Sequence, residues 1–114
     1  MTDEQISAQF DGAGDFIRRE LVCCGFKVYA YAIDGLISGG DASEYIFKPL
    51  SRISGDVNIR ALYNSALHGM VYNCVADACE DLDGVAMKLV NGFCVVLFPT
   101  VGAVAYEVKT GEKR

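Results

Sequence analysis

The sequence predicts an α/β (α+β) domain in which helices pack on a four-stranded mixed sheet, with its elements in the order β-β-α-α-β-β. Segments rich in β-branched and aromatic residues lie near both ends of the chain, and a helical periodicity of apolar residues lies between them. The length of 114 residues fits one hydrophobic core. We therefore expect a flexible lead-in over residues 1–15, with at most a short helix, and a single domain over residues 16–114.

The first two strands are predicted over residues 16–24 and 26–33, with Gly25 as the turn between them. Both faces of the second segment are largely apolar, which is typical of an interior strand. Asp34 and Gly35 end that strand. The glycines that follow supply the permissive backbone that a chain needs to leave a sheet.

Two helical regions are expected in the middle of the chain. Asp41 and Glu44 resemble a capping box, which predicts a helix from residue 41 to about 53 with a kink at Pro49. From Ile59 onward, apolar residues recur at helical spacing as far as residue 78, which predicts a long amphipathic helix. Acidic residues and a glycine at 81–84 then break or bend it, and a short helical turn reaches residues 91–92.

The last two strands are predicted over residues 93–98 and 103–109. The first is a continuous apolar run, as expected for a strand buried on both faces. In the second segment, successive side chains alternate between the two faces of the sheet, which is the period of a strand.

Composition excludes several classes of function. The net charge is −5 and the ten basic residues are scattered, which disfavours nucleic-acid binding. No apolar run approaches the roughly 20 residues of a membrane-spanning helix, so we expect this chain itself to be soluble. The five cysteines are odd in number and lack C-x-x-C spacing, which favours buried thiols in a reducing compartment. No motif indicates a cofactor.

A ligand site is possible in the loop after the second strand. Asp34, Gly35, Ser38 and Asp41 lie there, between the end of a strand and the start of a helix, where α/β domains often bind small molecules. A turn aspartate and a helix N-cap explain the two carboxylates equally well without a ligand.

Catalytic and metal sites are not indicated. His68 is the only histidine, and a surface hydrogen bond to a neighbour on its own helix is the simpler interpretation. The acids Asp77, Glu80, Asp81 and Asp83 would lie near a helix C-terminus, but they lack the alternating ligands of a calcium loop and are read as a solvated corner. We expect no metal ion, no catalytic residue and no enzymatic activity.

Three segments resemble a known family in their order and spacing: Asp15-Phe-Ile-Arg-Arg-Glu-Leu21, Tyr31-Ala-Ile-Asp-Gly-Leu-Ile37 and Ile46-Phe-Lys-Pro-Leu50. Together they resemble the N-terminal cytoplasmic region of the A subunit of spore nutrient germinant receptors. A weaker likeness continues from Leu89-Val-Asn-Gly92 to Thr110-Gly-Glu-Lys-Arg114. Ser38 departs from the pattern, because the family commonly has an acid there.

The resemblance implies a non-enzymatic domain of a spore germination receptor, on the cytoplasmic side of the inner spore membrane. Its partners would be the receptor B and C subunits and the membrane domain of the A subunit. It would contribute to receptor assembly, to sensing of a small nutrient germinant or to signal relay. The chain would form the first lobe of the cytoplasmic region. The alternative is a stand-alone small-molecule binding domain with its ligand at the loop after the second strand.

Overall fold

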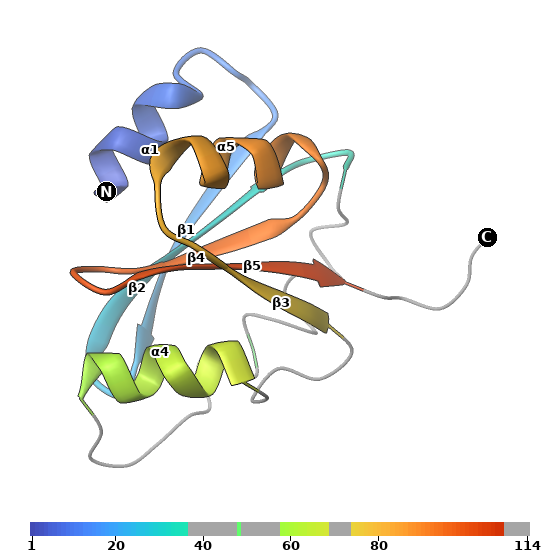
Figure 1. Ribbon diagram of the computed structural model, residues 1–114. Helices are drawn as coiled ribbons and strands as arrows, with labels where there is room; N and C mark the ends of the chain where they lie inside the picture. Colours follow the sequence, from blue (N-terminus) through green and yellow to red (C-terminus); the bar gives the residue numbers. More distant parts are fainter. Residues whose placement is uncertain (37–47, 49–57, 69–73, 109–114) are drawn as a thin grey trace.

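The computed structural model describes residues 1–36, 48, 58–68 and 74–108. The helices and strands within these ranges follow in the order α1 (Asp3–Gln9), β1 (Phe16–Cys23), β2 (Phe26–Ile33), α4 (Ile59–His68), β3 (Cys74–Cys79), α5 (Leu82–Val90), β4 (Cys94–Phe98) and β5 (Gly102–Val108) (Figure 1). The helix expected over residues 41–53 lies outside the described residues, except for Lys48, which is helical.

The sheet has five strands in the order β1-β2-β4-β5-β3, and every neighbouring pair is antiparallel. The prediction of a four-stranded mixed sheet in the order β-β-α-α-β-β was therefore wrong. Within the described ranges the order is β-β-α-β-α-β-β, preceded by α1. The error lies in one segment, which was assigned to a helix and is a strand.

That segment is β3. The apolar positions at 74, 75 and 78 continue the helical periodicity of α4, but helix α4 ends at His68. All six residues of β3 pair with β5, from Cys74 opposite Val108 to Cys79 opposite Ala103. The backbone groups along this side of β5 need hydrogen-bond partners, and β3 supplies them. Tertiary pairing thus outweighs a local helical pattern built from small residues.

The hairpin of β1 and β2 forms as predicted, with Phe16 opposite Ile33 and Cys23 opposite Phe26. Its two-residue loop has positive φ at both positions, 53° at Cys24 and 83° at Gly25. Such loops match the twist of the flanking strands, and glycine favours them at the second position. Strand β2 lies between β1 and β4, so its predicted interior position is confirmed. Strands β4 and β5 also form close to their expected positions. Helix α5 begins at Leu82, within the segment that was expected to break a helix, and is longer than the predicted short turn.

Helices cover both faces of the sheet (Figure 1). Leu62 and Ala66 of α4 are buried against one face, in a cluster that includes Phe98 and Tyr106. On the other face Ile6 of α1 lies in a second cluster, together with residues of α5 and of the central strands. All five residues of β4 are buried. The domain is therefore a three-layer arrangement with the sheet in the middle.

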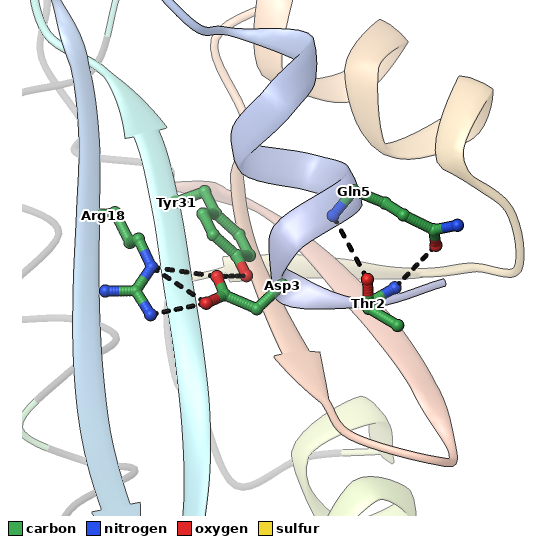
Figure 2. A network of polar contacts seen from close by, with 5 residues as sticks. All are labelled: Thr2, Asp3, Gln5, Arg18 and Tyr31. Carbon is green, nitrogen blue, oxygen red and sulfur yellow. Dashed lines mark hydrogen bonds and ion pairs between the residues drawn. The ribbon is translucent and has the colours of Figure 1, made fainter.

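Helix α1 is part of this packing. Its N-cap is Thr2, whose hydroxyl accepts a hydrogen bond from the backbone N–H of Gln5 at 3.2 Å, while the Gln5 side chain accepts from the Thr2 backbone at 2.9 Å (Figure 2). This reciprocal capping satisfies two N–H groups that a short helix would otherwise leave unpaired. Ile6 is fully buried. Residues 3–9 are thus a folded helix that helps to close the second cluster.

A buried hydrogen bond ties α4 to the sheet. The hydroxyl of Tyr106 on β5 donates to the backbone carbonyl of Ala66 at 2.8 Å. The ring of Tyr63 packs edge-on against Phe98, with 5.6 Å between centroids. A polar contact and an aromatic contact therefore fix α4 over β4 and β5.

Replacing Tyr106 with Phe should lower the free energy of unfolding by about 1 to 2 kcal/mol, because the Ala66 carbonyl loses a buried donor. Urea unfolding followed by circular dichroism measures this change. Tyr63→Phe is the matched control and should change stability by less than about 0.5 kcal/mol, since among the described residues the Tyr63 hydroxyl donates no hydrogen bond that holds α4. Equal effects of the two substitutions would contradict this explanation of how α4 is held.

Candidate functional site

One carboxylate connects α1 to the β1–β2 hairpin. Asp3 accepts hydrogen bonds from Arg18, at 2.9 Å from Nε to Oδ1 and at 2.5 Å from Nη2 to Oδ2. Its Oδ1 also accepts from the hydroxyl of Tyr31 at 2.6 Å. Figure 2 shows both donors converging on Asp3 from neighbouring strands. Three elements therefore meet at this one side chain.

The sequence positions the three groups through two local rules. Arg18 and Tyr31 are directly opposite each other in the antiparallel pair of β1 and β2, so their side chains share a face. The N-cap Thr2 lies one residue before Asp3, so α1 begins at Asp3 and this carboxylate is in its first turn. There it also interacts favourably with the helix dipole.

The electrostatics keep each group in one protonation state. The hydrogen bond from Arg18 is the main cause that lowers the pKa of Asp3 below its usual value, with a smaller contribution from Tyr31. Burial raises the pKa of Tyr31 well above its usual value, and the hydrogen bond to Asp3 adds to this. Asp3 is thus a stable anion and Tyr31 a neutral donor at neutral pH. This arrangement is suited to fastening α1 rather than to transferring a proton.

Aromatic side chains add to the contact between the N-terminal segment and the β1–β2 hairpin. Phe10 stacks on Phe16 with 4.9 Å between centroids, and Phe16 stacks on Tyr31 with 5.8 Å. The guanidinium carbon of Arg18 lies 5.0 Å from the centroid of the Tyr29 ring. Apolar stacking and a cation–π contact therefore reinforce the polar link between the N-terminal segment and the hairpin.

A groove lies beside this link and consists of two adjoining hollows. The larger hollow, about 320 Å³, lies between the start of α1 and the turn from β4 to β5 and is lined by Met1, Thr2, Asp3, Glu4, Tyr29, Leu97, Pro99 and Thr100. The smaller, about 170 Å³, is lined by Met1, Glu80, Leu97, Phe98, Thr100, Val101 and Gly102. Because the two share Met1, Leu97 and Thr100, we treat them together as the N-terminal groove.

The structure places only part of the ligand site predicted after β2. Asp34 and Gly35 are exposed, and the Asp34 backbone N–H donates to the Asp15 carbonyl at 2.7 Å. Gly35 has a φ of 92°, the left-handed backbone that favours glycine in a turn. Ser38 and Asp41 lie outside the described residues. Ligand binding by these four residues stays a prediction.

Of the acidic residues expected to form a solvated corner near a helix C-terminus, Asp81 and Asp83 lie at the start of α5. Asp81 is the N-cap of α5 and accepts from the backbone N–H of Gly84 at 2.7 Å, and Asp83 is in the first turn. Asp77 is on β3 and accepts from Lys88 at 3.2 Å. The predicted position was wrong because the preceding residues form a strand. In the described ranges no group of three or more acidic, histidine or cysteine side chains could hold a metal ion.

The thiols that the structure describes lie mostly in the core. Cys23, Cys79 and Cys94 are buried, and Cys24 is half-buried in the hairpin turn. Burial raises the pKa of Cys23 to about 11 and also raises the pKa of Cys79. These two thiols are therefore poor nucleophiles at neutral pH. Cys74 and Cys79 belong to β3 and not to the long helix predicted for this part of the chain.

The link through Asp3 could not be found by reading the sequence. Asp3 and Tyr31 are 28 residues apart, and no local pattern relates them. A signal for the helix itself exists, because Thr2 and Gln5 have the spacing of a capping box. That signal predicts where α1 begins, but not where it packs.

These elements define a class: a five-stranded antiparallel sheet with helices on both faces. Among solved structures, this chain is similar to the N-terminal domain of the A subunit of the Bacillus megaterium spore germinant receptor GerK3, with a TM-score of 0.68 and 14% sequence identity. The similarity covers 96% of this chain and 45% of that chain, so this chain spans less than half of its structural neighbour. At this identity the match shows the fold. No family model matches the sequence, and no curated protein matches it. None of the helices in the described ranges has the length and apolar character needed to cross a membrane.

Replacing Asp3 with Asn should lower the free energy of unfolding by about 1 to 2 kcal/mol, because the ion pair with Arg18 is lost while an acceptor for Tyr31 is kept. Asp3→Ala should cost more, since the buried Tyr31 hydroxyl then loses its acceptor. Chemical denaturation measures both. Glu4→Gln, at the next position of α1, is the matched control and should shift stability by no more than about 0.5 kcal/mol. Equal losses at positions 3 and 4 would contradict the proposed link.

The stability difference between the natural chain and Asp3→Asn should depend on pH. The pKa of Asp3 is lower in the folded state than its ordinary value of 3.8, so the folded state binds fewer protons at this site. Its contribution is therefore complete above the unfolded pKa and is lost as the pH falls through the lowered folded pKa. Unfolding measured from about pH 7 down to about pH 3 should show the difference shrinking only below about pH 4. A difference that is constant over this range would contradict the assignment.

Proposed function

We propose that this chain is a non-enzymatic domain of a spore germination receptor A subunit and that it contributes to receptor assembly or signal relay. The observation that supports this most directly is the match of its fold to a germinant receptor A-subunit domain over 96% of the chain. The fold alone does not establish a function, because proteins with the same fold have many different functions. The proposal therefore also depends on the sequence pattern that resembles the same family.

Two segments of that pattern, residues 15–21 and 31–37, are in contact where the structure describes them. The Asp34 N–H donates to the Asp15 carbonyl, and the ring of Phe16 stacks on Tyr31. Strands β1 and β2, which contain most of these residues, pair along their whole length. Two segments that pair as the strands of one hairpin have a structural reason for their fixed spacing. This agreement supports the family assignment beyond what the order of residues provides.

The chemistry of the described residues suits a binding or assembly role. His68, the chain's one histidine, is the exposed last residue of α4. Cys23 and Cys79 are buried thiols with raised pKa values. The strongest polar network, around Asp3, links secondary-structure elements and has its groups fixed in one protonation state. These features support a role without catalysis.

The proposed partners are the receptor B and C subunits and the membrane domain of the A subunit. The proposed location is the cytoplasmic side of the inner spore membrane. A small nutrient germinant acts on the whole receptor, in which this chain corresponds to one lobe of a larger cytoplasmic region. Under this proposal, the sheet and the helices on its two faces form a rigid unit. This unit either holds the receptor subunits together or transmits the signal between them.

Deletion of the coding region for residues 1–114 in the source organism tests the proposal. Spores of the deletion strain should lose the response to at least one nutrient, measured as the fall in optical density during germination. Immunoblots of the inner membrane should show lower levels of the B and C subunits, because assembly would fail. Restoring the natural sequence should restore both readouts, and so should Glu107→Gln, a control at an exposed position of β5.

Wild-type germination and unchanged subunit levels in the deletion strain would overturn the proposal. So would a source organism that forms no spores. If the levels of the B and C subunits fell while the germination response stayed normal, the proposed role in assembly would stand and the role in signal relay would be excluded.

A further inference from the structure

The N-terminal groove has the size and form of a small-molecule site. Its larger hollow, about 320 Å³, lies within the range of roughly 300 to 1,000 Å³ that ligand pockets occupy. The walls come from the start of α1, from β2 and from the turn between β4 and β5, which are distant in the sequence. Leu97, only 2% exposed, and Pro99 supply apolar surface. A ligand here would therefore contact several rigid elements at once.

The ionisable side chains that line the groove are acidic or neutral. They are Asp3, Glu4, Glu80 and Tyr29, and among the described residues no lysine, arginine or histidine lines either hollow. Asp3 is already neutralised by Arg18. Glu4 and Glu80 have no ion pair within the described ranges, and the chain as a whole carries a net charge of −5. Among the described lining residues the Met1 ammonium is the one positive group, so Glu4, Glu80 and this ammonium together leave one net negative charge for a cation.

A polar hydroxyl and an unusual backbone conformation lie at the same place. Tyr29 lines the larger hollow, and its hydroxyl makes no hydrogen bond in the part of the chain that the structure describes. Thr100 lines both hollows and has a φ of 69°. A β-branched residue is unfavourable in this left-handed region, where a turn alone would favour Gly or Asn. Strained residues of this kind gather at ligand sites.

We propose that the N-terminal groove binds a small organic ammonium compound with a short apolar chain. Glu4 and Glu80 attract the cationic end, while Leu97 and Pro99 contact the apolar chain. Tyr29 and Thr100 offer hydroxyl groups to the N–H donors. A carboxylate ligand would meet these acids with the same charge, and a neutral alcohol would lack the Coulombic attraction. None of the described residues after β2, Asp34 to Leu36, lines this groove, and the proposal does not depend on the receptor assignment.

A titration with isopentylamine, followed by two-dimensional NMR of the ¹⁵N-labelled chain with its natural N-terminus, tests the proposal. The backbone signals of Tyr29, Leu97 and Thr100 should shift and saturate at millimolar amine. Isovalerate and isopentanol, which have similar carbon chains, should give no saturable shift. Because the readout is binding to the purified chain, its failure would leave the germination experiment unaffected, and the reverse is also true.

Two sets of variants assign the binding to the named residues. The double variant Glu4→Gln/Glu80→Gln should weaken amine binding about fivefold, as expected for two exposed carboxylates. Glu107→Gln makes the same chemical change on β5 outside the groove and should bind as the natural chain does. Thr100→Gly should raise the midpoint of thermal unfolding and weaken amine binding, because it relieves the backbone and removes the hydroxyl group.

Several results would overturn the proposal. One is an amine titration that does not saturate, and another is a saturable shift that maps away from the groove. A third is equal binding of isovalerate. Unchanged affinity in the double variant, with circular dichroism showing that it is folded, would also exclude the two carboxylates as the site.

Discussion

The middle of the sheet is buried on both faces, and this burial requires a layer of side chains on each side. All five residues of β4 are inaccessible to solvent, and its neighbours β2 and β5 are mostly buried as well. Apolar strands of this kind are stable only when both faces are kept from water. Helix α4 covers one face, and α1 together with α5 covers the other (Figure 1). The position of every described helix follows from this constraint.

On the second face, one polar contact fastens α1 to the sheet. Tyr31 is fully buried, and its hydroxyl needs an acceptor in the folded state. Asp3 provides that acceptor and in turn requires a cation, which Arg18 supplies from the neighbouring strand. The same contact fixes the start of α1 beside the β4–β5 turn and so forms one wall of the N-terminal groove. Core packing, helix docking and the proposed amine site are therefore coupled through Asp3.

Local sequence patterns predicted the structure correctly where a segment's own residues determine it. The β1–β2 hairpin followed from two apolar runs around Gly25, and β4 followed from its continuous apolar run. Strand β3 was mistaken for helix because its small apolar residues fit both periods, and only pairing with β5 decides between them. The site around Asp3 and the hollow beside Thr100 depend on contacts between distant segments. No spacing within a single window could reveal them.

Native-state hydrogen exchange measures most directly whether α1 is an integral layer of the domain. The amide of Ile6, which donates to the Thr2 carbonyl at 3.1 Å, should be protected to nearly the same degree as the amides of Val95 and Val96 in β4. Protection of β4 should also decrease when Asp3 is replaced by Ala. If Ile6 exchanges like an unstructured peptide while β4 stays fully protected, α1 does not close the core, and the coupling of core packing to helix docking through Asp3 is contradicted.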